Sequence, residues 1–253
     1  MEALILAAGY ATRLRPLTDE RPKQLLPVGG RPMVDWILDK IAEARIPDVH
    51  LVTNARFALQ FEDWAIGRGV VVHDDGTTSN EDRLGAIGDV QFVREHAGID
   101  DDMLVIAGDN LFDYKLTEYL RWWEGKGGAS AVAVLDVGDV ELAKKYGIVD
   151  VDADDRIVDF VEKPEHPPST LAATATYVYA REHARLVPTY LADGNPPDQP
   201  GNFIAWLHKR APVYAYRFAG GWYDIGDPVQ LLAADNRMRE RAGLPTRDTY
   251  SLD

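Results

Sequence analysis

The chain has 253 residues, no cysteine and a formal net charge of −14 at pH 7. The absence of cysteine excludes disulfides, thiolate metal sites and a cysteine nucleophile, and the acidic balance argues against general binding to nucleic acid or to anionic membranes. The length suits one α/β domain over residues 1–253. The sequence contains neither a run of ~20 apolar residues nor an export signal, so we expect a cytoplasmic protein.

Strand and helix patterns alternate through the first half of the chain. Short apolar runs predict buried strands at residues 4–6, 49–53, 70–72, 103–107 and 129–135. Helical spacing of apolar residues predicts helices at residues 32–41, 85–96 and 116–123. This alternation predicts an α/β fold with a doubly wound, mostly parallel, Rossmann-like sheet, in which ligands bind at the carboxyl ends of the strands.

The pattern changes in the second half, where the expected strands add to the same sheet in antiparallel fashion. Segments at residues 146–151 and 157–161 flank an acidic turn, which predicts a hairpin. Further strands are predicted at residues 174–180 and 213–218, and a terminal helix at 229–240. The Gly- and Pro-rich stretch at 193–201 predicts an exposed loop. We interpret that loop as a solvent loop in preference to a lid.

The segment LAAGYATRL, at residues 6–14, follows the first predicted strand. Its small residues Ala7, Ala8 and Gly9 let backbone N–H groups approach a ligand closely, as a phosphate chain requires. Residues 1–31 also hold five Arg and Lys residues against three Asp and Glu residues. A locally basic segment in an acidic protein predicts a focused site for a small anion, although the GxxxxGK[ST] phosphate loop is absent.

Several motifs recur in a recognisable order along the chain. LAAGYATRLRPLTDERPKQLLPVGGRPM is followed by Gly108-Asp109-Asn110, then by YGIV at 146–149, EKP at 162–164 and WYDIG at 222–226. This series resembles the sugar-phosphate nucleotidyltransferases, the family that includes glucose-1-phosphate thymidylyltransferase, over nearly the whole chain. The resemblance implies transfer of a nucleotidyl group from a nucleoside triphosphate to a sugar 1-phosphate with release of pyrophosphate. It also implies a nucleotide-binding half at 1–135 and an acceptor-binding half at 136–253.

The resemblance further implies roles for individual residues. The catalytic residues would be Arg13, Lys23 and Asp109, and Mg²⁺ would be held by Asp109 and Asp224. The nucleotide would contact Leu6, Ala7, Ala8, Gly9, Arg13, Lys23, Asn80 and Gly85. The acceptor would contact Gly147, Glu162 and Lys163. Outside these motifs the two aspartates would be ordinary turn residues, and Gly147 would mark a strand bend.

Two departures from the family pattern affect the substrates, and a third, Ala11 in place of a frequent glycine, should only stiffen its loop. The family's Thr-Gly is Thr174-Ala175 here, whose extra methyl group would narrow the sugar pocket. The family's base-facing Gln and Gly-Leu-Ala-Gln-Ala correspond to residues 80–88, where Asn80 either reads a base edge or stabilises the preceding turn.

We predict a pyrimidine nucleotide, with dTTP or UTP ahead of CTP. The alternatives are a CTP-dependent cytidylyltransferase that acts on phosphocholine or a phosphonate, and a non-catalytic regulatory relative. The expected partners are a nucleoside triphosphate and a phosphorylated acceptor, with neither nucleic acid nor membrane, and a homo-oligomer is left open.

Overall fold

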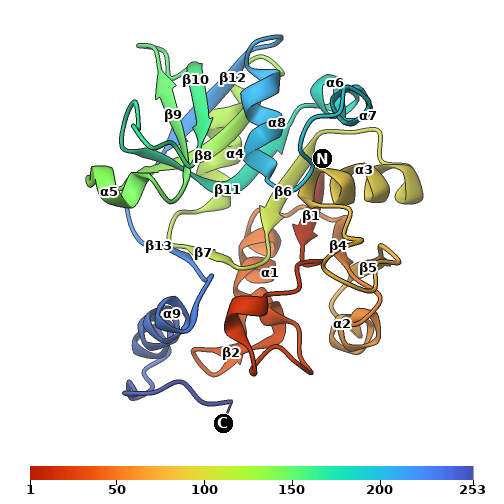
Figure 1. Cartoon of the computed structure of the whole chain (residues 1–253), viewed down its shortest axis with the longest axis vertical. Coiled ribbons are helices and arrows are strands. Elements are labelled where there is room, and N and C mark those ends of the chain that lie inside the picture. The colour runs from red at the N-terminus through yellow and green to blue at the C-terminus, as the bar shows by residue number, and fades with distance from the viewer. Residues whose placement is uncertain (253) are drawn as a thin grey trace.

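The computed structural model describes residues 1–252, whose centre is one large mixed sheet (Figure 1). Its nine strands are β1 (Glu2–Leu6), β4 (Val49–Thr53), β5 (Val70–Asp74), β6 (Met103–Ala107), β8 (Ser130–Asp136), β9 (Gly147–Val151), β10 (Ile157–Glu162), β11 (Leu171–Tyr179) and β12 (Val213–Arg217). Two small ribbons pair β2 (Pro27–Val28) with β3 (Arg31–Pro32), and β7 (Asn110–Phe112) with β13 (Trp222–Asp224).

Helices cover the sheet. They are α1 (Met33–Glu43), α2 (Ala58–Ala65), α3 (Ala86–Ala97), α4 (Leu116–Glu124), α5 (Val140–Ala143), α6 (Arg181–Ala184), α7 (Val187–Ala192), α8 (Pro200–Leu207) and α9 (Pro228–Arg241). Short 3-10 turns lie at Thr12–Leu14 and Lys23–Leu25. The sequence analysis predicted α1, α3, α4 and α9 to within a few residues. It did not predict α2 or α5 to α8, each of which has at most eight residues.

The strand directions confirm the predicted fold class. The order is β10-β9-β11-β6-β1-β4-β5, with β8 beside β11 and β12 beside β8. The pairs among β6, β1, β4 and β5 are parallel, and antiparallel pairing begins at β11 and continues through the β9–β10 hairpin. The second half therefore extends the sheet of the first half, as the sequence predicts. The expected antiparallel direction is wrong for β12, which runs parallel to its neighbour β8 because α6 to α8 cross over between β11 and β12.

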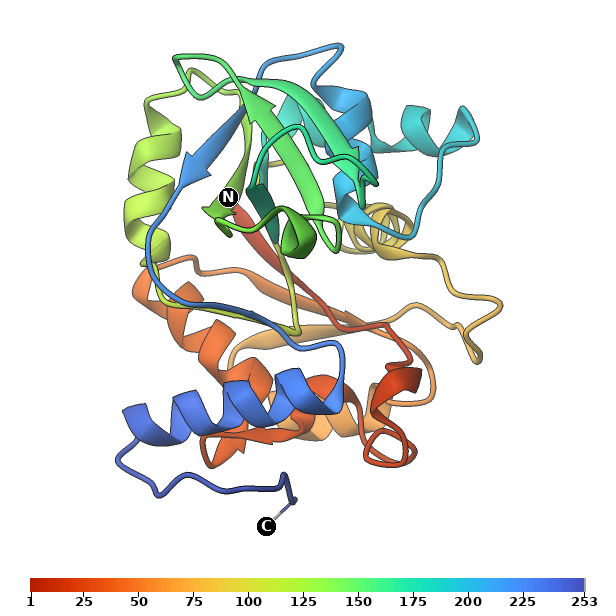
Figure 2. The same ribbon diagram turned by 60° about the vertical axis from the view of Figure 1, so that its left-hand side comes forward.

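The sheet separates two hydrophobic cores because side chains alternate along each strand. On β1, Ala3 and Ile5 belong to the core under α1, α2 and α4, whereas Leu4 and Leu6 belong to the core under α3, α7 and α8. Figure 2 shows α1 and α4 on one side of the sheet and α3 and α8 on the other. Both faces of β1 are sealed, so the strand can present a ligand site only at its carboxyl end.

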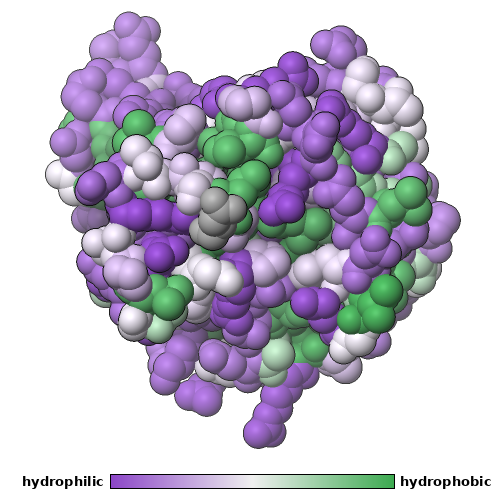
Figure 3. Space-filling view, turned by 90° about the horizontal axis from the view of Figure 1, so that it is seen from below, coloured by the Kyte–Doolittle hydropathy of each residue, from purple (hydrophilic) through white to green (hydrophobic). Residues whose placement is uncertain are grey.

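Surface apolar residues are scattered. In the view from below, hydrophobic residues form separate patches among hydrophilic ones (Figure 3). Large exposed apolar side chains include Leu59 on α2, Ile66 just after α2, and Val229 on α9. Within residues 1–252, no helix combines the length and apolar character needed to cross a bilayer.

A buried histidine pair makes stability depend on pH. His50 Nδ1 lies 2.8 Å from His73 Nε2, and His50 Nε2 lies 2.9 Å from Glu2 Oε2. Burial, reinforced by His50 and His96, lowers the pKa of His73 to about 4. The unfolded chain therefore binds a proton that the folded protein does not bind, and stability falls as the pH drops from the ordinary histidine value toward 4.

We expect this site to contribute about 2 kcal/mol of lost stability between about pH 7 and about pH 5. The variant His73→Gln keeps a hydrogen-bonding group but does not titrate, so its free energy of unfolding should fall less over the same interval. Denaturant titrations of both proteins at the two pH values measure the difference, and equal losses would contradict the assignment.

Candidate active site

A cavity of about 520 Å³ opens at the carboxyl ends of β1 and β6. Nearly all residues predicted to bind the nucleotide line it, namely Leu6, Ala8, Gly9, Arg13, Lys23, Asn80 and Gly85. Asp109, Asp224 and Lys163 line the same cavity, although they come from distant parts of the chain. The fold thus gathers the separate motifs around one space.

Ala7 is an exception, and here the structure corrects the expectation. Its side chain belongs to the core, and its backbone N–H donates to the Val52 carbonyl at 2.9 Å. The amide is therefore used in holding the end of β1 to β4. The backbone approach to a ligand falls to Ala8 and Gly9, which line the cavity.

The β7–β13 ribbon brings the two predicted metal ligands together. Asn110 pairs with Asp224 in this ribbon, and its Nδ2 donates to Asp109 Oδ1 at 2.8 Å and to Asp224 Oδ1 at 3.4 Å. Trp222 Nε1 donates to Asn110 Oδ1 at 2.7 Å. Asn110 is buried, so the indole fixes its amide orientation and the amide holds the two carboxylates side by side.

The charges around these carboxylates are unequal. Lys23 Nζ forms an ion pair with Asp109 and donates to the Ile225 carbonyl at 2.8 Å. Burial pushes the pKa of Asp109 upward, but the Lys23 ammonium and the Asn110 amide outweigh it and hold that pKa below its usual value. Burial and the neighbouring charge of Asp109 raise the pKa of Asp224 to about 6.

This donor set fits a hard divalent cation that also binds phosphate. Two adjacent ionised carboxylates with only one ammonium carry an excess negative charge, which an additional bound cation would neutralise. Within residues 1–252, no three His, Cys, Asp or Glu side chains are grouped so that they could hold a metal. An ion bound by Asp109 and Asp224 would therefore need ligands from a substrate or from water, which is typical of Mg²⁺ sites in phosphoryl chemistry.

Arg13 also lines the large cavity, from the Thr12–Leu14 turn. A Cβ atom on Gly226 would lie 3.0 Å from Arg13 Nη2, so the glycine leaves room for the guanidinium beside the WYDIG segment. Arg13 is exposed and can turn toward an anion in the cavity. Its planar fork suits phosphate oxygens.

A smaller cavity of about 150 Å³ adjoins the first and contains the predicted acceptor residues Gly147, Glu162 and Lys163. Cβ atoms on Gly147 and Gly201 would lie 2.8 and 2.7 Å from Glu162 Oε2, so both glycines are needed for this carboxylate to fit. Burial raises the pKa of Glu162. Lys163, Ala175 and Asp224 line both cavities, which makes them neighbouring parts of one site.

The loop at 193–201 is not the plain solvent loop that its composition predicts. Asp198, Gln199 and Pro200 line the large cavity, and Pro200 begins α8. Ile87 N donates to the Pro197 carbonyl at 2.9 Å, and Arg83 holds Asp198 through two hydrogen bonds of 3.0 and 3.1 Å. These contacts tie the start of α3 to the second half of the chain. The sequence signal was misleading because Pro also favours the first turn of a helix.

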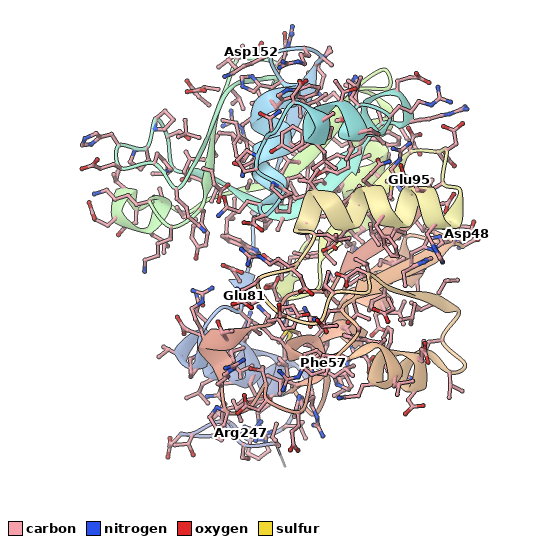
Figure 4. All side chains as sticks on the ribbon, turned by 45° about the vertical axis from the view of Figure 1, so that its right-hand side comes forward. Asp48, Phe57, Glu81, Glu95, Asp152 and Arg247 are labelled. Atoms are coloured by element: carbon pink, nitrogen blue, oxygen red, sulfur yellow. The ribbon has the colours of Figure 1, made fainter. Side chains whose placement is uncertain are left out.

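Other cavity residues were missed by sequence reasoning. They are Tyr10, Gln24, Asp89, Ala107 and Asn110, whereas Arg83 and Ala86, which also line the large cavity, belong to the run 80–88 that was predicted to face the base. Figure 4 shows Glu81, from the segment that joins β5 to α3, at a level between Arg247 below and Asp152 above. Asn80, next to Glu81, is exposed at the cavity. The carboxylate of Asp82 accepts the hydrogen bonds from Thr78 N and Ser79 N in the preceding turn, a role that the sequence analysis offered for Asn80. Asn110 stands within the quoted GDN motif and could have been found there.

Ala175 adopts a backbone conformation that favours glycine. Its φ is 52°, at the place where β11 shifts register against β8. Ala11, with φ 45°, and Lys163, with φ 47°, share this strained region and also line the large cavity. The two alanines that replace the family's glycines therefore keep the glycine-type backbone, at a cost of roughly 1 kcal/mol each.

We expect Ala175→Gly to raise the free energy of unfolding by up to about 1 kcal/mol, because it relieves the left-handed strain. The same change widens the wall shared by the two cavities. Chemical denaturation measures the stability, with Ala205→Gly in the helical part of α8 as a control that should destabilise by about 1 kcal/mol. A loss of stability in Ala175→Gly would show that the strain is compensated.

Known proteins with similar sequences are nucleotidyl transferases by their names or family. The sequence pattern of the family described as nucleotidyl transferase matches residues 2–241. The bifunctional protein GlmU of Methanocaldococcus jannaschii is 28% identical over 241 residues, which are 95% of this chain and 55% of that protein. The "Putative mannose-1-phosphate guanyltransferase" of Sulfolobus acidocaldarius is 30% identical over 232 residues, which are 90% of this chain and 60% of that protein. The chain thus spans less than two thirds of the length of either relative.

Solved structures show the same fold. A UDP-glucose pyrophosphorylase complexed with UDP-glucose has a TM-score of 0.80 at 23% identity, covering 95% of this chain and 98% of that one. A Bacillus anthracis structure titled as a putative glucose-1-phosphate thymidylyltransferase has a TM-score of 0.78 at 24% identity, covering 95% and 96%. The family match extends over nearly all of the described chain, and the chain therefore belongs to the nucleotidyl transferase family.

Proposed function

We propose that this protein transfers a nucleotidyl group from a pyrimidine nucleoside triphosphate to a sugar 1-phosphate and releases pyrophosphate, with Mg²⁺ held by Asp109 and Asp224. One observation carries the proposal. Lys23, Asp109 and Asp224 converge on a cavity that adjoins a second one containing Glu162 and Lys163. Two neighbouring spaces with cationic and carboxylate groups between them suit two phosphorylated substrates that must react with each other.

The reaction needs positioning and charge neutralisation more than a strong base. An acceptor phosphate oxygen attacks the α-phosphorus, and pyrophosphate leaves with its bonding electron pair. Lys23 supplies positive charge beside Asp109, and Arg13 can hold the outgoing phosphates through its guanidinium. When bound, Mg²⁺ would neutralise charge on the phosphate oxygens. Lys163 would hold the acceptor phosphate, and Glu162 would accept hydrogen bonds from sugar hydroxyls.

The comparisons support the class of reaction more than the base. The names of the relatives and structural neighbours include a guanyltransferase, a thymidylyltransferase and UDP-glucose pyrophosphorylases. Our preference for a pyrimidine comes from the Asn80 amide, which can pair with a pyrimidine edge, and from the close backbone at Gly85, which limits the room for a purine. Gly85 itself is crowded by the Pro197 carbonyl, 2.8 Å from where a Cβ atom would lie.

Pyrophosphate release tests the proposal directly. The protein is incubated with Mg²⁺, each of dTTP, UTP, CTP, GTP and ATP, and a panel of sugar 1-phosphates, phosphocholine and phosphonates. We expect turnover with a sugar 1-phosphate and with dTTP or UTP, and loss of turnover in excess chelator. A preference for CTP with phosphocholine or a phosphonate would instead identify a cytidylyltransferase. Binding without turnover of any pair would identify a regulatory relative.

A further inference from the structure

Asp89 is a buried acid that faces the large cavity and has no role in the mechanism above. It lies in the first turn of α3, is 5% exposed and lines the cavity. Its Oδ1 is sealed from solvent and receives no hydrogen bond from any described donor among residues 1–252. Because Oδ1 is sealed, the oxygen that can meet a ligand in the cavity is Oδ2.

Asp75, just after β5, is the partner of this buried acid. Its Oδ1 accepts hydrogen bonds from Thr77 N and Thr77 Oγ1, both at 2.7 Å. Its Oδ2, like Asp89 Oδ1, is sealed and has no donor in the described chain. The two carboxyl groups lie within hydrogen-bonding reach of each other. Two facing acceptors of this kind are satisfied only when one proton lies between them.

The electrostatics place this proton on Asp89. Burial and the charge of Asp75 raise the pKa of Asp89 to about 8. Burial also raises the pKa of Asp75, but the two hydrogen bonds from Thr77 oppose that rise. A hydrogen on Asp89 Oδ1 that is donated to Asp75 Oδ2 would satisfy both of the sealed oxygens at neutral pH. The carbonyl-like Oδ2 of Asp89 is left as an acceptor of fixed orientation toward the cavity.

An acceptor suits the base of the nucleotide and does not suit its phosphates. The cations expected to hold phosphates, Arg13 and Lys23, come from the segment after β1, whereas Asp89 lies on α3 beyond Gly85. Next to a phosphate chain, an ionised acid would repel the phosphate oxygens, and the free acceptor oxygen of a protonated acid would face further acceptors. A heterocyclic base, in contrast, presents N–H donors on its edge that an oriented oxygen can select.

We propose that Asp89 determines base specificity, with Oδ2 accepting a hydrogen bond from the ring N–H of the donor nucleotide's base. Thymine and uracil carry a hydrogen on N3, whereas N3 of cytosine is an acceptor and would face Oδ2 unfavourably. Asp75 is a positioning residue that fixes the proton on the far oxygen. This inference rests on the proposed function, and it selects dTTP or UTP over CTP within it.

Two substitutions at one position separate hydrogen bonding from packing. Asp89→Leu removes both oxygens and keeps the branching of the side chain at Cγ. Asp89→Asn can donate from Nδ2 to Asp75 and present its carbonyl to the cavity, as protonated Asp89 does. Glu95→Leu on the same helix is the matched control, because Glu95 is exposed near the other end of α3 (Figure 4).

The measurement is calorimetric binding of each nucleotide to the full chain with Mg²⁺ and without acceptor. We expect Asp89→Leu to weaken dTTP and UTP at least about 10-fold and CTP by less than about 3-fold, and Asp89→Asn to restore most of that loss. Equal weakening of all nucleotides, or an Asn variant as defective as the Leu variant, would overturn the proposal. Should Asp89→Leu fail to fold, as judged by circular dichroism, Asp89→Ala replaces it under the same criteria.

The role of Asp89 in base selection and the proposed catalytic function can fail independently of each other. Guanine also carries a ring N–H. If the wild-type protein prefers GTP and the Asp89→Leu variant loses that preference, the result would support base selection by Asp89 and contradict the pyrimidine assignment. Selective binding without pyrophosphate release would support Asp89 and contradict catalysis. Pyrophosphate release with an unchanged nucleotide preference in the Leu variant would support catalysis and contradict Asp89.

Discussion

Asp109→Asn and Asp224→Asn are each expected to lower kcat by at least about 100-fold. The two carboxylates are held together by the Asn110 amide at 2.8 and 3.4 Å, and their combined charge is what would attract a divalent cation. An asparagine keeps the shape of the side chain but removes that charge. The fold should remain, since both side chains line the cavity and neither belongs to the hydrophobic cores.

The measurements are pyrophosphate release at increasing Mg²⁺ and the midpoint of thermal unfolding. Asp227→Asn is a matched control three residues from Asp224. Asp227 caps α9 by accepting from Val229 N and Gln230 N at 2.9 Å, and asparagine is an equally good cap. The control should keep its kcat. Full turnover in either site variant, or in wild-type protein with excess chelator, would refute the metal assignment.

Lys23→Ala should mainly lower kcat, by about 100-fold, whereas Lys163→Ala should mainly raise the KM for the acceptor, by about 10-fold. Lys23 is only 11% exposed and contacts Asp109 and the Ile225 carbonyl, so its ammonium stays at the place where phosphate charge develops. Lys163 is exposed between the two cavities, with a left-handed backbone that turns it toward both. The two lysines thus serve different substrates.

Initial rates with each substrate varied in turn separate the two effects. Lys209→Ala is the control, since Lys209 is an exposed lysine just after α8 and lines neither cavity. Removing Lys23 also leaves the Asp109 charge without its ion-pair partner, so the variant's thermal midpoint must be compared with that of the wild type. Equal effects of both substitutions, confined to the KM of the nucleotide, would contradict this division.

Local patterns were sufficient for the elements of the central sheet and its longer helices. β4 and β6 have the predicted bounds because buried strands are continuous apolar runs, and α3 ends near Gly98, a glycine with a φ of 70°. The short helices α5 to α8 were missed because helices of four to eight residues have too few turns for a periodic signal and depend on packing.

The sequence by itself determined which small, cationic and acidic residues belong to the candidate site, because each motif is a contiguous segment that can be recognised from its own residue types. Only the tertiary structure decided which of them meet. Asp109 and Asp224 are neighbours because β7 pairs with β13, and Asp89 comes within reach of Asp75 because α3 packs back over β1 and β4, next to the end of β5. The pKa of a carboxyl group depends on burial and on charges within a few ångströms, whatever their distance along the chain. The proton between Asp75 and Asp89 therefore could not be read from residues 75 and 89 before the fold had brought them together.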